Sequence, residues 1–473
     1  MANRGALVYK RTAMDPVRRP AVPRLLAAIV FAVVLADCLL WSARIIPGDA
    51  PDEPDHVALR AFVAREGRLP RVGEAGFDLH FIDLTAKRRV ETVADPVSGA
   101  VSWNFPPGHR FDLRQPYLFS PQLAHLLGGA FCRALGGFTL ARARAFNALC
   151  VAAAALAVFV AAWTAWRRAG PAVVAGLGFG LWPQVAFVGG YVNDDAFALL
   201  AAALVVAALA AIDRDGMNGR RSAFLGLALG LVALSKYYVY AAFGLVLLWG
   251  LARARAAGRA FPRGMLVAAG VAALVSGWWF VRNALIYKGD PLALGVIGRR
   301  IDAIAAALPP RVAANTDLLS ASSLHRRGQP VSALFVHGWI RLTADSFFGR
   351  FGWMSRRFPV AVYVAAAALL AGAVLGVLRR RTDAAVPRSL VFVLFGPVFL
   401  VLLLFESLSN SYFVDWQPQG RYLLPSLAGL WPFVVGLGTR HAPPVGRIYP
   451  WALLAFVAAA NAAAVAFYVV PRG

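Results

Sequence analysis

The chain has 473 residues, of which 59% are apolar and only 15% are charged, and its mean hydropathy is +0.61. Soluble proteins carry about a quarter charged residues, so this composition excludes a conventional water-soluble protein and predicts a polytopic membrane protein. The net charge of +24 does not indicate nucleic-acid binding, because most Arg and Lys residues lie in short loops between apolar segments, where they encode membrane orientation.

In chain order, a basic N-terminus over residues 1–23 precedes a single transmembrane bundle over 24–470. The first apolar run has no small-residue cleavage site after Trp41, which predicts a retained anchor. Eleven segments have the length and apolar character of a membrane span: 24–43, 141–166, 171–190, 195–212, 221–238, 239–253, 264–283, 358–378, 388–406, 421–438 and 448–470. The expected fold class is an all-α membrane protein of about eleven transmembrane helices with juxtamembrane helices on the outer face.

Residues 117–135 are moderately apolar but carry Gln122, His125 and Arg133. If this segment does not span, the Arg-rich short loops all share the side of the basic N-terminus; if it spans, they all move outside. We therefore expect an interfacial or re-entrant helix here, with the N-terminus in the cytoplasm.

This topology places three polar stretches, 44–140, 284–357 and 407–420, on the outer face. Amphipathic patterns at 55–66 and 333–353 predict helices that lie flat at the membrane surface. Cys38, Cys132 and Cys150 stand singly in apolar stretches, which indicates neither a disulfide framework nor a zinc site.

The densest polar cluster follows the first predicted span and contains Asp49, Asp52, Glu53 and Asp55. Helix capping explains part of it, with Asp52 as the N-cap and two further acids near the positive end of the helix dipole. The alternative is a functional site, because Glu53 and His56 would share a helix face at a spacing usable for an acid/base pair or a metal.

A second acidic cluster, Asn193, Asp194 and Asp195, lies at the predicted outer entrance of a span. An Asn or Asp at a helix start is an ordinary cap, but two adjacent acids at a membrane boundary favour a functional site. Lys236 also lies on the outer side, and either snorkels to the interface beside aromatic residues or contacts a phosphate.

Two outer arginines at helix ends, Arg282 and Arg421, depart from the expected charge distribution, and Gln419 lies beside the second. A guanidinium binds phosphate oxygens in a bidentate manner, so these positions suit recognition of a phosphate.

Seven short motifs in this order resemble a bacterial membrane protein family, the domain of unknown function 2142, over residues 25 to 440. They are Pro51-Asp52-Glu53-x-x-His56, Asn193-Asp194-Asp195-Ala196, Leu234-Ser235-Lys236-Tyr237, Gly277-Trp278-Trp279-x-x-Arg282-Asn283, Gly289-Asp290-Pro291-Leu292, Phe351-Gly352-Trp353-Met354 and Gln419-Gly420-Arg421-Tyr422. That family in turn is similar to C-type glycosyltransferases, which use polyprenyl-phosphate sugars.

The resemblance implies a polyprenyl-phosphate sugar donor, a catalytic acid in the first outer loop and a second acid near a later helix junction. Asp52 or Glu53 would be the first acid and Asp195 the second. His56, Asn193, Asp194, Lys236, Arg282, Gln419 and Arg421 would bind substrate.

The expected protein is an inverting glycosyltransferase of the bacterial cytoplasmic membrane, with its active face outside and a glycan, lipid or protein as acceptor. Its partners would be the donor and membrane lipids, not nucleic acid. A divalent metal is compatible with this activity but is not indicated by ligand spacing. A polysaccharide polymerase or ligase and a lipid-linked glycan transporter are the alternatives.

Overall fold

The computed structural model describes residues 22–70, 77–78, 110–111, 120–258, 262–295, 324–325, 328–375, 386, 389–414 and 416–468. The expected cytoplasmic segment therefore lies outside the described residues, except for its last two positions. The described part is helical, with two short antiparallel strand pairs, β1 (Phe77–Asp78) with β2 (Arg110–Phe111) and β3 (Arg350–Phe351) with β4 (Arg356–Arg357).

The N-terminal half of the described chain contains ten helical elements. These are α1 (Arg24–Arg44), α2 (Glu53–Glu66), α3 (Leu123–Ala134), α4 (Leu140–Trp166), α5 (Ala169–Gly180), α6 (Pro183–Gly190), α7 (Asp195–Asp215), α8 (Gly219–Ala233), η2 (Tyr237–Tyr240) and α9 (Ala241–Ala256).

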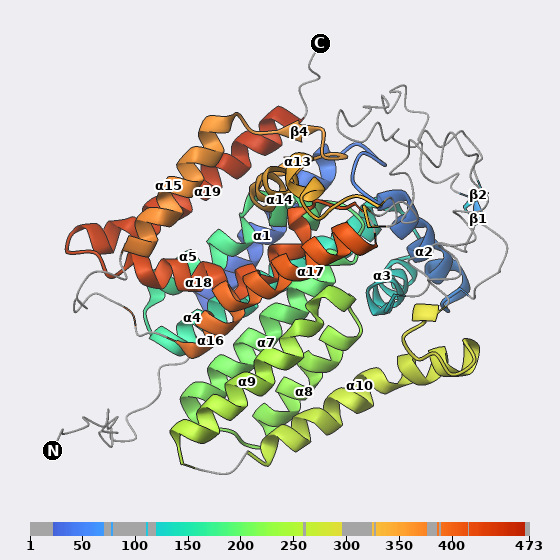
Figure 1. Cartoon of the computed structure of the whole chain (residues 1–473), viewed down its shortest axis with the longest axis horizontal. Coiled ribbons are helices and arrows are strands. Elements are labelled where there is room, and N and C mark those ends of the chain that lie inside the picture. Colours follow the sequence, from blue (N-terminus) through green and yellow to red (C-terminus); the bar gives the residue numbers. More distant parts are fainter. Residues whose placement is uncertain are drawn as a thin grey trace.

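The C-terminal half continues with further helices around the same bundle (Figure 1). These are α10 (Gly264–Ile286), α13 (Ala333–Val336), α14 (Trp339–Phe348), α15 (Val360–Val374), α16 (Leu390–Val393), η5 (Leu394–Val398), α17 (Phe399–Phe413), η6 (Gly420–Ser426), α18 (Leu427–Gly438) and α19 (Val445–Tyr468).

Seven helical segments of the described chain are long and apolar enough to span a membrane. They are Arg24–Arg44, Leu140–Trp166, Asp195–Asp215, Tyr237–Ala256, Gly264–Ile286, Leu390–Phe413 and Val445–Tyr468. The bent pair α5 and α6 would make an eighth if it is one span. The chain is thus an all-α polytopic membrane protein, as expected, while the number of eleven spans stays a prediction.

The expected spans that fall short do so for local reasons. The segment predicted at 221–238 ends as a helix at Ala233, and the one at 171–190 bends by 55° between α5 and α6, where Pro183 begins the second helix. The helix expected within 117–135 is α3, which has 12 residues and is too short to span, in agreement with the prediction.

Small residues allow α1 to pack closely on α5. A Cβ at Gly176 would lie 3.0 Å from a Val30 methyl, and one at Gly180 would lie 2.4 Å from a Val34 methyl. Close approach through small residues is the usual basis of helix packing in membranes, where lipid removes most of the hydrophobic driving force. The long α4 packs against α1, α5 and α7, so it is the central helix of the bundle.

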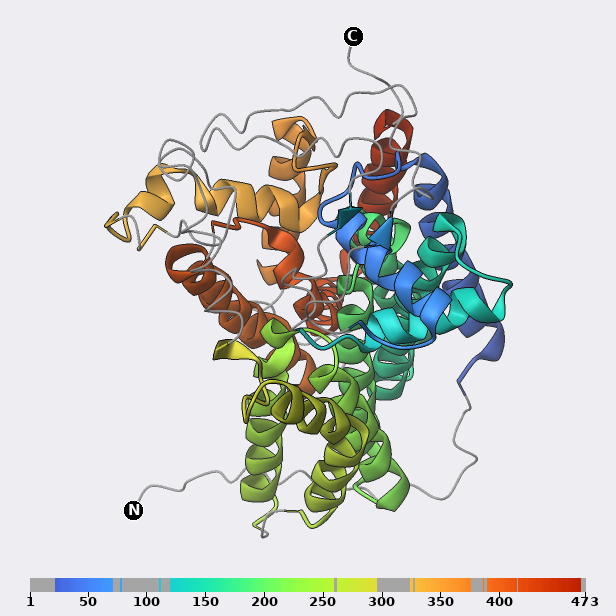
Figure 2. The same cartoon turned by 90° about the vertical axis from the view of Figure 1, so that its right-hand side faces the viewer.

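The helix predicted at 55–66 forms as α2. Its residues from His56 to Ala64 are buried, and α3 packs beside it (Figure 2). Arg60 is fully buried and donates hydrogen bonds to the carbonyl of Ala143 and the side chain of Asn147 at 2.6 and 2.8 Å. Arg60 was expected on a polar face and instead binds α4, whereas Arg65 and Glu66 at the end of the helix are exposed. That α2 lies flat at the membrane surface stays a prediction.

Candidate active site

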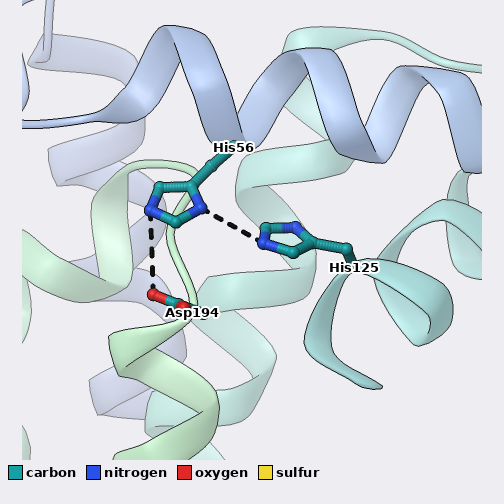
Figure 3. Close-up of side chains that lie close together, drawn as sticks. All are labelled: His56, His125 and Asp194. Atoms are coloured by element: carbon teal, nitrogen blue, oxygen red, sulfur yellow. Dashed lines mark hydrogen bonds and ion pairs between the residues drawn. The ribbon is translucent and has the colours of Figure 1, made fainter. Parts of the chain in front are cut away.

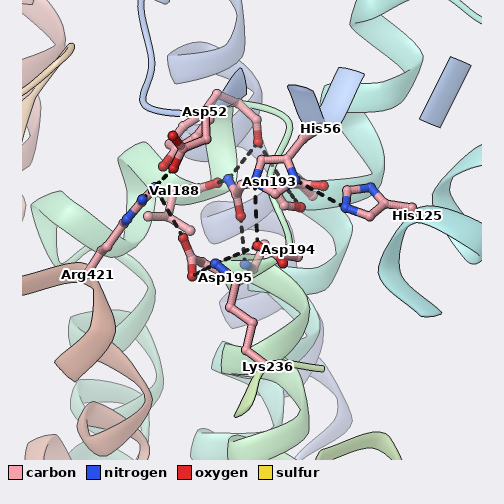
Figure 4. Close-up of polar contacts among 12 residues, drawn as sticks. Asp52, His56, His125, Val188, Asn193, Asp194, Asp195, Lys236 and Arg421 are labelled. Atoms are coloured by element: carbon pink, nitrogen blue, oxygen red, sulfur yellow. Dashed lines mark hydrogen bonds and ion pairs between the residues drawn. The ribbon is translucent and has the colours of Figure 1, made fainter. Parts of the chain in front are cut away.

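The polar side chains at the starts of α2, α7 and η6 lie close together (Figure 4). Arg421 Nη2 donates to Asp52 Oδ2 at 2.5 Å, and its Nη1 lies 3.7 Å from Asp195 Oδ2. Lys236 Nζ lies 2.6 Å from Oδ1 of both Asp194 and Asp195. Residues from four distant parts of the sequence thus form one alternating chain of charges.

Asp52 holds the N-cap position of α2 but does not cap it. Its backbone is left-handed, with φ 61° and ψ 3°, and its side chain makes no capping hydrogen bond. A non-glycine residue in this conformation carries strain, which is common at functional sites. The carboxylate instead points to Arg421 with 24% of the side chain exposed, so capping does not explain this acid.

Glu53 differs sharply from its neighbour, because it is 1% exposed and all its acceptor positions are occupied. Arg144 binds it in a bidentate manner, with both nitrogen to oxygen distances at 2.8 Å. The backbone N–H groups of Gly48 and Val192 donate to the same two oxygens at 3.0 and 3.1 Å. Glu53 thus joins the loop before α2 to α4 and to the segment before α7, and it does not pair with His56.

Asn193 supplies the cap of α7 and so leaves the adjacent acids available. Its Oδ1 accepts the backbone N–H of Ala196 at 2.9 Å, whereas Asp194, at the N-cap position, makes no side-chain cap. Asp195 Oδ1 accepts from the hydroxyl of Tyr238 at 3.0 Å in addition to Lys236. The two acids are therefore held by side chains across the site and not by their own helix.

The charged groups of the site shift one another's pKa values. Burial would raise the pKa of the Asp52 carboxyl, but Arg421, His56 and Lys236 together lower it more, so the net pKa lies below its usual value. Burial would likewise lower the pKa of Lys236, and the carboxylates of Asp194 and Asp195 raise it above the ordinary lysine range. Asp52 and Lys236 are therefore charged at neutral pH, and Lys236 does not snorkel to water, since its side chain is only 12% exposed.

Arg421 has unused hydrogen-bonding capacity. Its Nε and Nη1 are buried and have no hydrogen-bond partner among the described residues. Gln419 Oε1 is buried without a partner in the same part of the chain. Unsatisfied buried donors are costly, and a guanidinium with free donors beside a partly exposed carboxylate is a ready anion-binding group.

Arg282, predicted to bind the phosphate, makes its contacts away from this cluster within the described chain. It lies over the ring of Trp279, 5.1 Å from its centroid, and donates to the carbonyl of Pro70 at 3.4 Å. Sequence reasoning missed Arg144, Tyr238 and Tyr422, whose hydroxyl accepts a hydrogen bond from Arg421 Nη2 at 3.2 Å. Arg144 is an isolated arginine near the start of an apolar span, a position that could have signalled a buried partner.

A separate contact fixes the loop that leads to Asp52. Asp49 Oδ2 accepts from Arg356 Nη1 at 2.6 Å and from the hydroxyl of Tyr468 at 2.7 Å, while Trp353 Nε1 donates to Gly48 O at 2.9 Å. The hairpin of β3 and β4 and the last turn of α19 therefore hold this loop in place.

Comparison with protein families gives a match over residues 109–430, more than half of the chain, to predicted membrane protein (DUF2142). The chain belongs to this family. The match begins after the Asp52 motif, so it is shorter than the range over which the motifs resemble the family. Comparison with curated proteins gives no match.

Comparison of this DUF2142 member with solved structures gives matches at low identity. Arabinofuranosyltransferase AftD from Mycobacteria is 18% identical with a TM-score of 0.49, and covers 96% of this chain, which spans only 28% of that protein. ArnT from Cupriavidus metallidurans, bound to undecaprenyl phosphate, is 15% identical with a TM-score of 0.37, over 95% of this chain and 90% of that protein.

Proposed function

We propose that this protein is an integral membrane glycosyltransferase that moves a sugar from a polyprenyl-phosphate carrier to an acceptor at the outer face of the bacterial cytoplasmic membrane. The observation that carries the proposal is Arg421, whose Nε and Nη1 make no hydrogen bond to any described residue and lie beside the partly exposed carboxylate of Asp52. Such a pair offers an anion-binding group and a base in contact with each other.

Arg421 and Lys236 are the groups that would bind the donor phosphate. Both are fixed by ion pairs with acids, and neither can lose its proton near neutral pH, since the pKa of each is raised. Fixed cations stabilise the negative charge that develops on a leaving phosphate more than flexible ones do, because no reorganisation is needed. Gln419 Oε1, an acceptor without a partner, would orient a hydroxyl of the donor sugar or the acceptor.

Asp52 is the preferred base, and Glu53 supports it. All acceptor positions of Glu53 are filled by two backbone N–H groups and Arg144, so it cannot take a further proton without breaking a buried ion pair. Asp52 would accept the proton of the acceptor hydroxyl while that oxygen attacks the anomeric carbon. The bond from this carbon to the phosphate oxygen then breaks, and its electron pair leaves with the polyprenyl phosphate.

A single displacement of this kind inverts the anomeric configuration, in contrast to the two displacements of a retaining glycosidase. Asp195 would act indirectly, by fixing Lys236 and Tyr238 and by contributing to the position of Arg421. A polymerase or ligase that moves a preassembled glycan would share this chemistry, and the size of the transferred group separates it from a monosaccharide transferase.

The test uses purified full-length protein in lipid nanodiscs with undecaprenyl phosphate, the group released from every donor of this class whatever its sugar. We expect Arg421→Gln to weaken its binding by about 10- to 100-fold, the value of one or two charged hydrogen bonds. Asp52→Asn should bind it nearly normally but lower transfer from undecaprenyl-phosphate sugars by about 10²- to 10⁴-fold, because general-base catalysis is lost.

Two variants serve as controls. Arg447→Gln changes an exposed arginine at the start of α19 and should alter neither measurement. Glu53→Gln should lower the free energy of unfolding by about 3–5 kcal/mol, because it leaves the buried guanidinium of Arg144 without its anionic partner. Equal binding of undecaprenyl phosphate by the wild type and Arg421→Gln, or full transfer activity of Asp52→Asn, would contradict the proposal.

A further inference from the structure

Two histidines and one acid form a buried cluster beside the site described above (Figure 3). His56 comes from α2, His125 from α3 and Asp194 from the position before α7, and each is at most 2% exposed. His56 Nδ1 lies 3.1 Å from His125 Nε2, and His56 Nε2 lies 3.7 Å from Asp194 Oδ1. One potential metal-binding atom from each residue lies within 4.8 Å of the other two.

The ligand types of this cluster suit metal binding. Each imidazole offers a nitrogen atom and Asp194 offers a carboxylate oxygen, and these atoms lie within 4.8 Å of one another. All three side chains are buried, so a bound ion would be shielded from solvent.

We propose that His56, His125 and Asp194 bind one divalent transition metal ion of the Zn²⁺ class. A tetrahedral Zn²⁺ with bonds of 2.0–2.2 Å separates its ligand atoms by about 3.4 Å, and with one atom from each residue the three ligand atoms of this cluster lie within 4.8 Å of one another. Because His56 can offer only one nitrogen, small rotations of the imidazole rings are needed to bring the third ligand in. Two imidazoles and one carboxylate favour Zn²⁺, Fe²⁺ or Ni²⁺ over Mg²⁺ and Ca²⁺, which prefer oxygen ligands alone.

A bound ion would change the contacts of Lys236. Its ammonium now lies 2.6 Å from Asp194 Oδ1, so a metal would bind the second carboxylate oxygen or displace the ammonium from Asp194. In either case Lys236 keeps Asp195 as a partner at 2.6 Å. The ion would join α2, α3 and the start of α7, and would thereby fix the helix whose first residue follows Asp52. This positioning role goes beyond the proposed transfer reaction and does not depend on it.

The test measures metal binding by the full-length protein in detergent. The protein is first stripped of metal with a chelator, which is then removed by dialysis. We expect about one Zn²⁺ or Co²⁺ per chain in equilibrium dialysis, with Co²⁺ giving the visible absorption of tetrahedral coordination. His125→Gln should lower the affinity at least 100-fold. His337→Gln, on the outer helical segment and outside the cluster, is the matched control and should bind like the wild type.

His125→Cys keeps the test decisive if the Gln variant folds poorly. A thiolate in place of the imidazole should add an intense sulfur-to-Co²⁺ charge-transfer band in the near ultraviolet, which only direct coordination produces. Absence of stoichiometric metal in the wild type, or undiminished affinity in His125→Gln, would overturn the proposal and leave a hydrogen-bonded histidine pair. Neither result bears on transfer activity, so failure here is distinct from failure of the proposed function.

Discussion

Arg421 connects two carboxylates that come from distant parts of the chain. Asp52 lies 369 positions before it and yet accepts its hydrogen bond at 2.5 Å, while Asp195 approaches the same guanidinium from α7. The contact to Arg421 keeps Asp52 ionised in spite of its burial, and a base must be ionised to accept a proton. The catalytic competence of Asp52 therefore depends on its cation as well as on its position.

The pH dependence of transfer follows from this contact. Because the pKa of Asp52 is lowered below 3.8, the carboxylate form is present above that value and is lost only as the pH falls through the lowered pKa. The acid limb of the transfer rate should lie below about pH 4 in the wild type. His56 and Lys236 also lower this pKa, so Arg421→Gln removes only part of the effect.

In Arg421→Gln the acid limb of the residual activity should move to higher pH, since burial then raises the pKa with less opposition. Initial rates at saturating donor between pH 3 and 7 measure it. If the acid limb lies at the same pH in this variant as in the wild type, the limb reports the titration of a group other than Asp52.

At the level of single residues, the acids and cations of the site were predictable because charges at membrane boundaries are costly and stand out in an apolar sequence. Which of the two adjacent acids is free was not predictable. That depends on Arg144 and on the backbone N–H of Val192, both of which reach Glu53 only through the packing of α4 and the turn before α7.

The placement of Arg421 depends on how η6 packs against α14. The backbone of Gly420 approaches Phe347 so closely that a Cβ there would lie 2.1 Å from the Phe347 nitrogen, and the Gly420 N–H donates to Ser346 Oγ at 2.6 Å. A backbone atom cannot move aside as the tip of a side chain can. The element that carries Arg421 therefore tolerates only glycine at this contact.

Gly420→Ala should displace η6 and reduce undecaprenyl phosphate binding and transfer together, each by at least about tenfold, because both depend on the position of Arg421. Gly244→Ala is the control, since a Cβ there meets nothing within 4 Å and alanine favours a helix. Both quantities are measured in nanodiscs as above. Normal activity of Gly420→Ala would show that η6 does not position the guanidinium.

At the level of elements, α2 and α3 were predictable from the acidic cluster and from the moderate hydropathy of the segment after it. Their burial was not. The sequence pattern of α2 predicts that Arg60 faces water. In the fold it instead donates hydrogen bonds to Ala143 and Asn147 on α4. Pattern reasoning assigns polar residues to solvent and cannot identify a polar partner on another helix.

For the whole molecule, the charge distribution of the loops predicted that Asp52, Asp195 and Gln419 share one face, and their segments do lie close together. Which side of the membrane they face stays a prediction. The described cysteines are all buried, so the wild type offers a low labelling background.

Labelling of single cysteines introduced at exposed positions measures the membrane topology directly. Glu66→Cys, at the end of α2, should react with a membrane-impermeant maleimide in intact cells, and Arg220→Cys, at the start of α8, only after permeabilisation. The reverse pattern would place the site in the cytoplasm and exclude an acceptor in the outer leaflet.

The pairing of Arg421 and Lys236 with acids also bears on turnover. A phosphate that binds Nε and Nη1 of Arg421 shares the guanidinium with Asp52 and Asp195, so its binding free energy is reduced by the carboxylates that already neutralise this cation. Such sharing keeps the product complex from becoming a trap, because the carboxylates compete for the same cation as the spent carrier leaves. Weak product inhibition by the carrier phosphate is the kinetic property that this arrangement favours.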